Sequence, residues 1–99
     1  MTERVIHKFP LKRQGHQVIK VTGLLNVLDV QVQRDELVMW CARLEPSEEV
    51  TCIGVQLVGT GHPIPENVSG RRYFRTVQDI SGLVWHVFTT TTEAPDARD

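Results

Sequence analysis

One loop carries the residue types best suited to bind a ligand. It runs from residue 59 to residue 67, contains two glycines and a histidine, and is followed by two arginines. Glycines permit positive φ angles and a close approach of the backbone, and the amides beside them can cradle an anion. A histidine and arginines could supply positive charge to that anion. The candidate ligand site therefore comprises Gly59, Thr60, Gly61, His62, Arg71 and Arg72.

The same loop also has a purely structural interpretation. Its glycines would then form a bulge at the end of a strand. Pro63 and Pro65, which hold the residues before them extended, would steer a long crossover between sheets. The loop lacks the lysine and the following helix of a nucleotide-triphosphate P-loop. The sequence leaves both interpretations open.

Catalytic and metal-binding patterns are sparse in the rest of the chain. Ser47, Ser69 and Ser81 lie in expected turns without the surroundings of an activated nucleophile, and no HxH or HExxH pair is present. An enzyme would use His62 or His86 as its general base, yet the sequence shows no partner for either. We expect a chain that is not an enzyme, with no catalytic residues, no metal and no cofactor.

Three residues with reactive side chains have a simpler interpretation as buried or half-buried strand residues. Cys41 and Cys52 lie in expected strands without a CxxC pair or further ligands at metal-site spacing, so we expect buried thiols in a reducing compartment. His86 lies in a strand with largely apolar faces, where a histidine is usually half-buried and satisfied.

The elements that position these residues are short strands. Segments rich in Val, Ile, Thr and aromatic residues alternate with Gly, Pro, Asn and Asp, and no segment has a helical period of ten or more residues. We predict an all-β fold of about seven mainly antiparallel strands with little helix, in a small sandwich or partly closed barrel. The expected strands are 4–9, 16–21, 26–33, 37–44, 50–58, 72–78 and 83–90. Residues 1–90 would form a single domain and residues 91–99 a flexible tail.

The expected strand at 37–44 is apolar on both faces. Such a strand lies at the centre of a packed sheet, or its second face meets another subunit. The candidate subunit interface comprises Leu37, Met39, Cys41 and Trp85. The register of the preceding hairpin is open, because a two- or four-residue turn places Val30 opposite Met39 and a three-residue turn places Val30 opposite Trp40.

Composition excludes several classes of function. The 99 residues are 40% hydrophobic and 23% charged with a net charge of −1, which is typical of one soluble globular domain. No apolar run approaches the ~20 residues of a membrane-spanning helix, and no secretion signal is present, so we expect a cytoplasmic protein. The net charge is +4 in residues 1–20 and −4 in residues 29–49. This layout suits self-association, docking on a partner or capture of a small anion, but offers too few cations for generic binding to nucleic acid.

Several segments in order resemble a family of small uncharacterised proteins from tailed bacteriophages and prophages. The resemblance spans roughly residues 5–88 and is carried by HKFPL at 7–11, VQVQ at 30–33, GTGHPIP at 59–65, TVQ at 76–78 and GLVWHVF at 82–88. It implies a phage origin and a location in the cytoplasm of the host bacterium. The chain departs from the family at its hairpin turn, Arg34–Glu36, where family members often have an Asn-Gly-like sequence, and in its Thr-rich C-terminal segment.

These observations predict a non-enzymatic, phage-encoded binding module. It would contact a host or phage protein, and would act as a homo-oligomer through the 59–72 loop and the apolar second face of the 37–44 strand. The alternative is a protein that sequesters an anionic, nucleotide-like small molecule at the 59–72 loop, at a boundary between subunits.

Overall fold

The part of the chain that the structure describes forms seven strands, and their bounds agree with the expected segments to within three residues. The computed structural model describes residues 1–13, 15–65 and 72–93, with the side chains of 91–93 left out. The strands are β1 (Glu3–Leu11), β2 (His16–Thr22), β3 (Leu24–Gln33), β4 (Glu36–Glu45), β5 (Val50–Gly59), β6 (Arg72–Gln78) and β7 (Val84–Glu93). The described residues contain no helix long and apolar enough to span a membrane.

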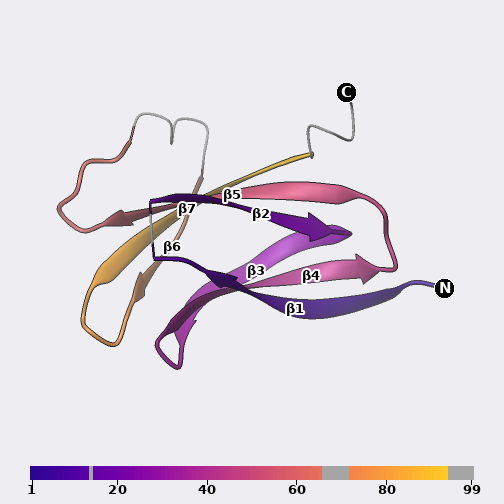
Figure 1. Cartoon of the computed structure of the whole chain (residues 1–99), viewed down its shortest axis with the longest axis horizontal. Coiled ribbons are helices and arrows are strands. Elements are labelled where there is room, and N and C mark those ends of the chain that lie inside the picture. The colour runs from indigo at the N-terminus through magenta and orange to yellow at the C-terminus, as the bar shows by residue number, and fades with distance from the viewer. Residues whose placement is uncertain (14, 66–71, 94–99) are drawn as a thin grey trace.

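The strands form two antiparallel sheets that pack as a sandwich and do not close into a barrel (Figure 1). One sheet has the order β1-β4-β3, and the other has the order β2-β5-β7-β6. Strand β7 therefore lies between β5 and β6, although it comes last in the chain. This order brings the end of β5, the start of β6 and the middle of β7 together on one sheet.

The chain passes from one sheet to the other at Gly23, between β2 and β3. Gly23 has a φ of +72° and is buried. Its N–H donates to Glu49 O and its carbonyl accepts from Leu44 N, both at 2.7 Å. A Cβ atom at Gly23 would lie 2.1 Å from the Leu44 carbonyl oxygen. Only glycine fits this crossing, because its conformation and its surroundings both exclude a side chain.

The hairpin between β3 and β4 has a two-residue turn, which settles its register. Gln33 pairs with Glu36, and Val30 consequently lies opposite Met39. The turn residues Arg34 and Asp35 have φ angles of +51° and +63°, as a type I′ turn requires.

Arg13, which lies between β1 and β2, supports this turn. Its Nη2 donates to both the carbonyl oxygen (2.7 Å) and Oδ1 (2.9 Å) of Asp35. This contact fixes a turn conformation that non-glycine residues adopt at a cost.

The inward face of β4 lies in the core between the sheets. Leu37, Met39 and Cys41 are each at most 2% exposed and belong to the core cluster, with Val30 of β3 and Ile53 of β5 among their neighbours in that cluster. Trp85 packs against the same cluster from β7. The structure thus places the four candidate interface residues in or against the core, because the four-stranded sheet covers this face of β4.

The last strand is longer than the sequence indicates. Strand β7 runs to Glu93, and its final residues pair with β5, where Thr51 lies opposite Glu93. Strand β7 thus includes residues 91–93, which the sequence assigned to a tail, because a run of threonines, which are β-branched, continues the strand. Residues 94–99 lie outside the described residues.

Candidate functional site

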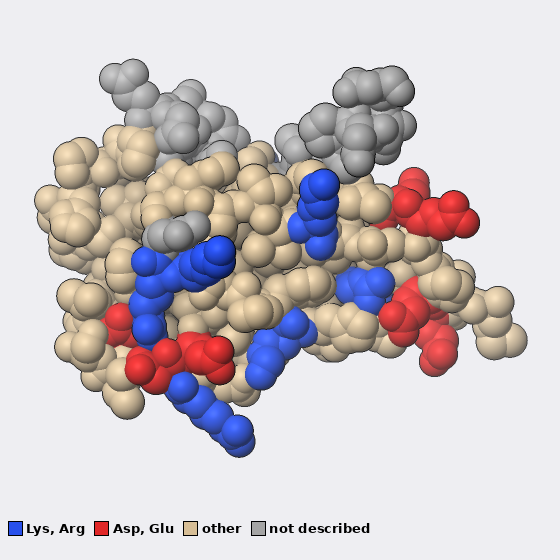
Figure 2. Space-filling model, viewed as in Figure 1, with Lys and Arg blue, Asp and Glu red and all other residues tan. Residues whose placement is uncertain are grey.

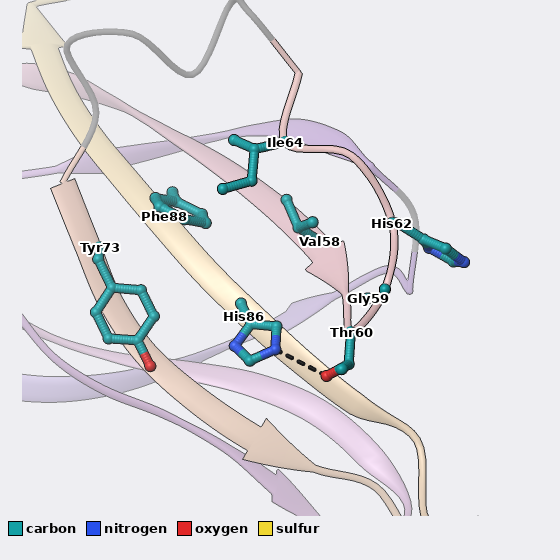
Figure 3. Close-up of a pocket in the computed structure, with 9 residues that line it drawn as sticks. Val58, Gly59, Thr60, His62, Ile64, Tyr73, His86 and Phe88 are labelled. Carbon is teal, nitrogen blue, oxygen red and sulfur yellow. Dashed lines mark hydrogen bonds between the residues drawn. The ribbon is translucent and has the colours of Figure 1, made fainter.

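A hollow of about 300 Å³ lies between the loop at 60–65 and the outer face of the four-stranded sheet (Figure 3). Its walls come from the end of β5, from this loop, from β6 and from β7. The lining residues are Val58, Gly59, Thr60, Gly61, His62, Ile64, Tyr73, His86 and Phe88. The volume is at the lower end of the range for small-molecule sites.

Strand register brings the sheet residues of the hollow side by side. His86 of β7 lies opposite Val58 of β5, and two residues further along β7, on the same face, Phe88 lies opposite Tyr73 of β6. The rings of Tyr73 and Phe88 pack edge to face, with centroids 5.6 Å apart and an interplanar angle of 75°. Ile64 reaches over this surface from the loop (Figure 3). Most of the wall area is therefore apolar.

Hydroxyl groups on both sides fix the His86 ring in the hollow. Its Nε2 lies 2.8 Å from Thr60 Oγ1, and its Nδ1 lies 3.1 Å from Thr76 Oγ1. The hydroxyl of Thr76 is in turn hydrogen-bonded to the hydroxyl of Tyr73. An imidazole with a partner at each nitrogen has one orientation, which is a requirement for selective recognition.

The loop turns sharply after β5, and two glycines allow it. The amide of His62 donates to Gly59 O at 3.0 Å, and that of Thr60 donates to Val84 O at 3.3 Å. Gly61 has a φ of +89°, which favours glycine. A Cβ at Gly59 would lie 3.0 Å from His62 Nδ1, so the His62 ring packs against this glycine. Figure 3 shows that the ring points away from the hollow.

The structure brings together four of the six residues that the sequence assigned to a ligand site. Gly59, Thr60, Gly61 and His62 line the hollow. Arg72 is exposed on β6 but does not line it. Arg71 lies outside the described residues. The part of the hollow that the structure describes therefore lacks the expected arginine contacts.

Sequence reasoning missed five residues of the hollow: Val58, Ile64, Tyr73, His86 and Phe88. Alternation along the strand at 83–90 does put His86 and Phe88 on one face. The missing information is that β7 lies next to β5, since nothing in the spacing of the two segments shows it.

A second hollow, of about 330 Å³, lies beside the same loop and is also lined by Arg13 and Gly15, which lie between β1 and β2. Arg13, Gln56, His62 and Trp85 are among its lining residues. Gln56 is only 4% exposed, and its side-chain amide donates to Leu57 O at 3.4 Å. The loop thus separates two concavities of similar size.

Asp79 holds Trp85, one of the residues that line the second hollow. It accepts hydrogen bonds from the hydroxyl (2.6 Å) and the amide (2.9 Å) of Ser81, from Leu83 N (3.1 Å) and from Trp85 Nε1 (3.2 Å). The hydrogen bond from the Ser81 hydroxyl is the largest cause that lowers the pKa of Asp79, and it outweighs the effect of desolvation. Arg13 Nε lies 3.6 Å from the same carboxylate. These contacts fix the Trp85 indole and the β6–β7 turn.

Charges of both signs lie at the surface, mostly away from the first hollow. Carboxylates gather at the end of the molecule that carries the β4–β5 connection, where Glu45, Glu48 and Glu49 are exposed (Figure 2). Arg43 pairs with Glu45 at 3.1 Å, and Arg75 pairs with Asp29 at 3.2 Å.

The described residues contain no cluster of side chains that could bind a metal ion. Among residues 1–13, 15–65 and 72–93, no three His, Cys, Asp or Glu side chains are grouped to hold a metal ion. Both cysteines are free and buried, and burial raises the pKa of the Cys41 thiol to about 11.

Comparisons with known proteins place the chain in a family without giving it an activity. No curated protein and no solved structure matches it. A family model matches residues 2–98, which is nearly the whole chain. The chain therefore belongs to the family described as a domain of unknown function, DUF7352.

Proposed function

We propose that this chain is a non-enzymatic binding protein whose first hollow, beside the 60–65 loop, holds a small ring-bearing molecule. The observation that carries the proposal is the fixed imidazole of His86 in a concavity with apolar walls. Small-molecule sites commonly combine such walls with a few oriented polar groups.

The composition of the hollow favours a ring over a phosphate group. Val58, Ile64 and Phe88 offer apolar contact, whereas Arg72 does not line the hollow. A nucleotide-like ligand, which is the small-molecule alternative from the sequence, would therefore place its base in the hollow. Its charged part would extend toward solvent.

The contacts of His86 favour binding over catalysis. A histidine that acts as a general base is usually oriented by a carboxylate and faces a nucleophile or a substrate proton. Both ring nitrogens of His86 instead face threonine hydroxyls. This arrangement fixes the ring and leaves neither nitrogen facing a substrate proton.

The test uses two exposed isoleucines as a matched pair. Ile64 is 60% exposed and lines the hollow, whereas Ile80 is 78% exposed and lies in the β6–β7 turn. A carboxylate at position 64 would place an unpaired charge against apolar walls. We expect native mass spectrometry of protein from gently lysed bacterial cells to detect a bound small molecule on the wild type and on I80D, and none on I64D.

A small molecule that binds equally to wild type, I64D and I80D would refute the assignment of the first hollow as the binding site. Amide chemical-shift mapping with small aromatic molecules then gives the second measurement. Shifts confined to residues outside the hollow would also contradict the proposal.

Contact with a protein partner, or with a second copy of the chain, is the second candidate function. Ile6 of β1 and Leu25 of β3 are 64% and 47% exposed, and both line a shallow concavity of about 520 Å³ with Ala42 of β4. Exposed apolar patches of this kind often mark interaction sites. We expect I6K to lower the mass measured by light scattering if this face joins copies, with L83K, which is exposed in the β6–β7 turn, as the control.

The proposed biological setting is the cytoplasm of an infected bacterium. It is supported by the resemblance of residues 5–88 to proteins of tailed bacteriophages. Antibodies against the chain, applied to fractions of phage-infected cells, would detect it with the cytosol if this setting is correct and with virions or membranes if it is not.

A further inference from the structure

Four side chains form one continuous hydrogen-bonded chain at the first hollow. The order is Thr60, His86, Thr76, Tyr73. Both end residues, Thr60 and Tyr73, line the hollow, whereas Thr76 is exposed on β6 and does not line it. The chain therefore ends in a hydroxyl at two residues that line the hollow.

The number of protons in this chain limits what the two ends can do. A hydroxyl has one proton to donate, and a neutral imidazole has one N–H. The three hydrogen bonds use three of the four protons when His86 is neutral. One O–H is left over, and it can lie at only one end of the chain at a time.

The tautomer of His86 decides which end holds the spare proton. With the proton on Nε2, His86 donates to Thr60, and the Thr60 hydroxyl is free to donate into the hollow while the Tyr73 oxygen accepts. With the proton on Nδ1, His86 donates to Thr76, Thr76 donates to Tyr73, and the Tyr73 hydroxyl is free to donate while Thr60 Oγ1 accepts. The hollow has one donor end and one acceptor end in both states.

We propose that this coupling makes the hollow selective for uncharged aromatic heterocycles that carry a hydrogen-bond acceptor at one edge and an N–H donor at the opposite edge. The inference rests on the proposed function and names the ligand class of the same site. A heterocycle of this class satisfies both ends, and the tautomer adjusts to either orientation of the ring.

Rings of the same shape with acceptors at both edges lose a hydrogen bond. One of their two acceptors meets a hydroxyl that has no proton left to donate. A neutral hydrogen bond changes affinity by about two- to tenfold. Apolar contact with Val58, Ile64 and Phe88 is common to all these rings, so the difference in affinity isolates the polar effect.

Two bicyclic probes of nearly equal shape test the inference. 4-Quinolone has an N–H and a carbonyl group at opposite edges of one ring, and quinoxaline has acceptor nitrogens at both positions. Titrations followed by amide chemical shifts give a dissociation constant for each. We expect the wild type to bind 4-quinolone about two- to tenfold more tightly than quinoxaline.

The substitution Thr76→Val breaks the hydrogen-bonded link between His86 and Tyr73 without changing the residues that contact the ligand, because Thr76 does not line the hollow. Valine has the shape of threonine but cannot link His86 to Tyr73. The Tyr73 hydroxyl can then donate whatever Thr60 does, so we expect the preference for 4-quinolone to fall toward one while both probes still bind. T76S keeps the hydroxyl and should keep the preference.

The possible results separate this inference from the proposed function. Equal binding of both probes in the hollow of the wild type, or a preference that persists in T76V, would overturn the selectivity and leave the binding site intact. Failure of both probes to shift any amide of the hollow would overturn the site and the inference together.

Discussion

Replacement of Gly23 by alanine tests the crossing between the two sheets. A positive φ costs a residue with a Cβ about 1–2 kcal/mol. The added Cβ would also lie 2.1 Å from Leu44 O and 2.9 Å from Ser47 Cβ, so the end of β4 and the β4–β5 connection must move. That movement disrupts the two 2.7 Å hydrogen bonds of Gly23, each worth about 1 kcal/mol. The sum predicts a loss of about 3–4 kcal/mol in the free energy of unfolding.

Gly82 provides the matched control for this prediction. Its φ is +92°, but a Cβ there meets nothing within 4 Å. G82A should therefore lose only the conformational part, about 1–2 kcal/mol. Urea unfolding followed by tryptophan fluorescence measures both, and each kcal/mol corresponds to about 4–8 °C in Tm for a domain of this size. Equal destabilisation of G23A and G82A would refute the argument that the Leu44 carbonyl excludes a side chain.

Three other buried groups give predictions about stability and reactivity. Truncation of the fully buried Met39 to alanine should cost about 2–5 kcal/mol in urea unfolding, and M39E should unfold the chain rather than yield a folded monomer, as circular dichroism would show. A folded M39E would contradict the core assignment. Asp79 has a lowered pKa in the folded state, so its contribution is present above the ordinary carboxyl pKa and is lost as pH falls through the lowered value. The difference in unfolding free energy between wild type and D79N should therefore narrow in acid, and a constant difference across pH would count against the hydrogen bonds of Asp79. Alkylation of the Cys41 thiol near neutral pH, followed by mass spectrometry, should require unfolding, because burial raises its pKa to about 11; rapid labelling of the native protein would exclude this burial.

Local sequence patterns predict the strands well because each pattern is read within one segment. Polar residues alternate with apolar ones in β3, and turn residues separate it from β4, so both strands could be placed without knowledge of their neighbours. The two faces of β4 are both apolar, and alternation alone cannot say which of them the other sheet covers. That information comes from long-range pairing, which puts Met39 in the core.

The candidate site shows the same division between local and long-range information. Glycine and proline signals locate the loop correctly, because its conformation depends on its own residues. Arg72, which the sequence groups with this loop, does not line the hollow, because nearness in sequence does not determine which way a strand residue faces. His86 joins the site only because β7 inserts between β5 and β6, an order that hydrophobic periodicity does not contain.

Strand β5 is buried at every residue from Cys52 to Val58, and the loop of the first hollow begins directly at its end. The rate of amide hydrogen exchange should therefore rise abruptly between β5 and the loop. Amides of β5 should exchange only on global unfolding, whereas amides of the loop should exchange by local opening. A loop held by such a strand has one end fixed. If the proposed ligand binds here, the entropy that the loop loses on binding comes from the residues after the turn.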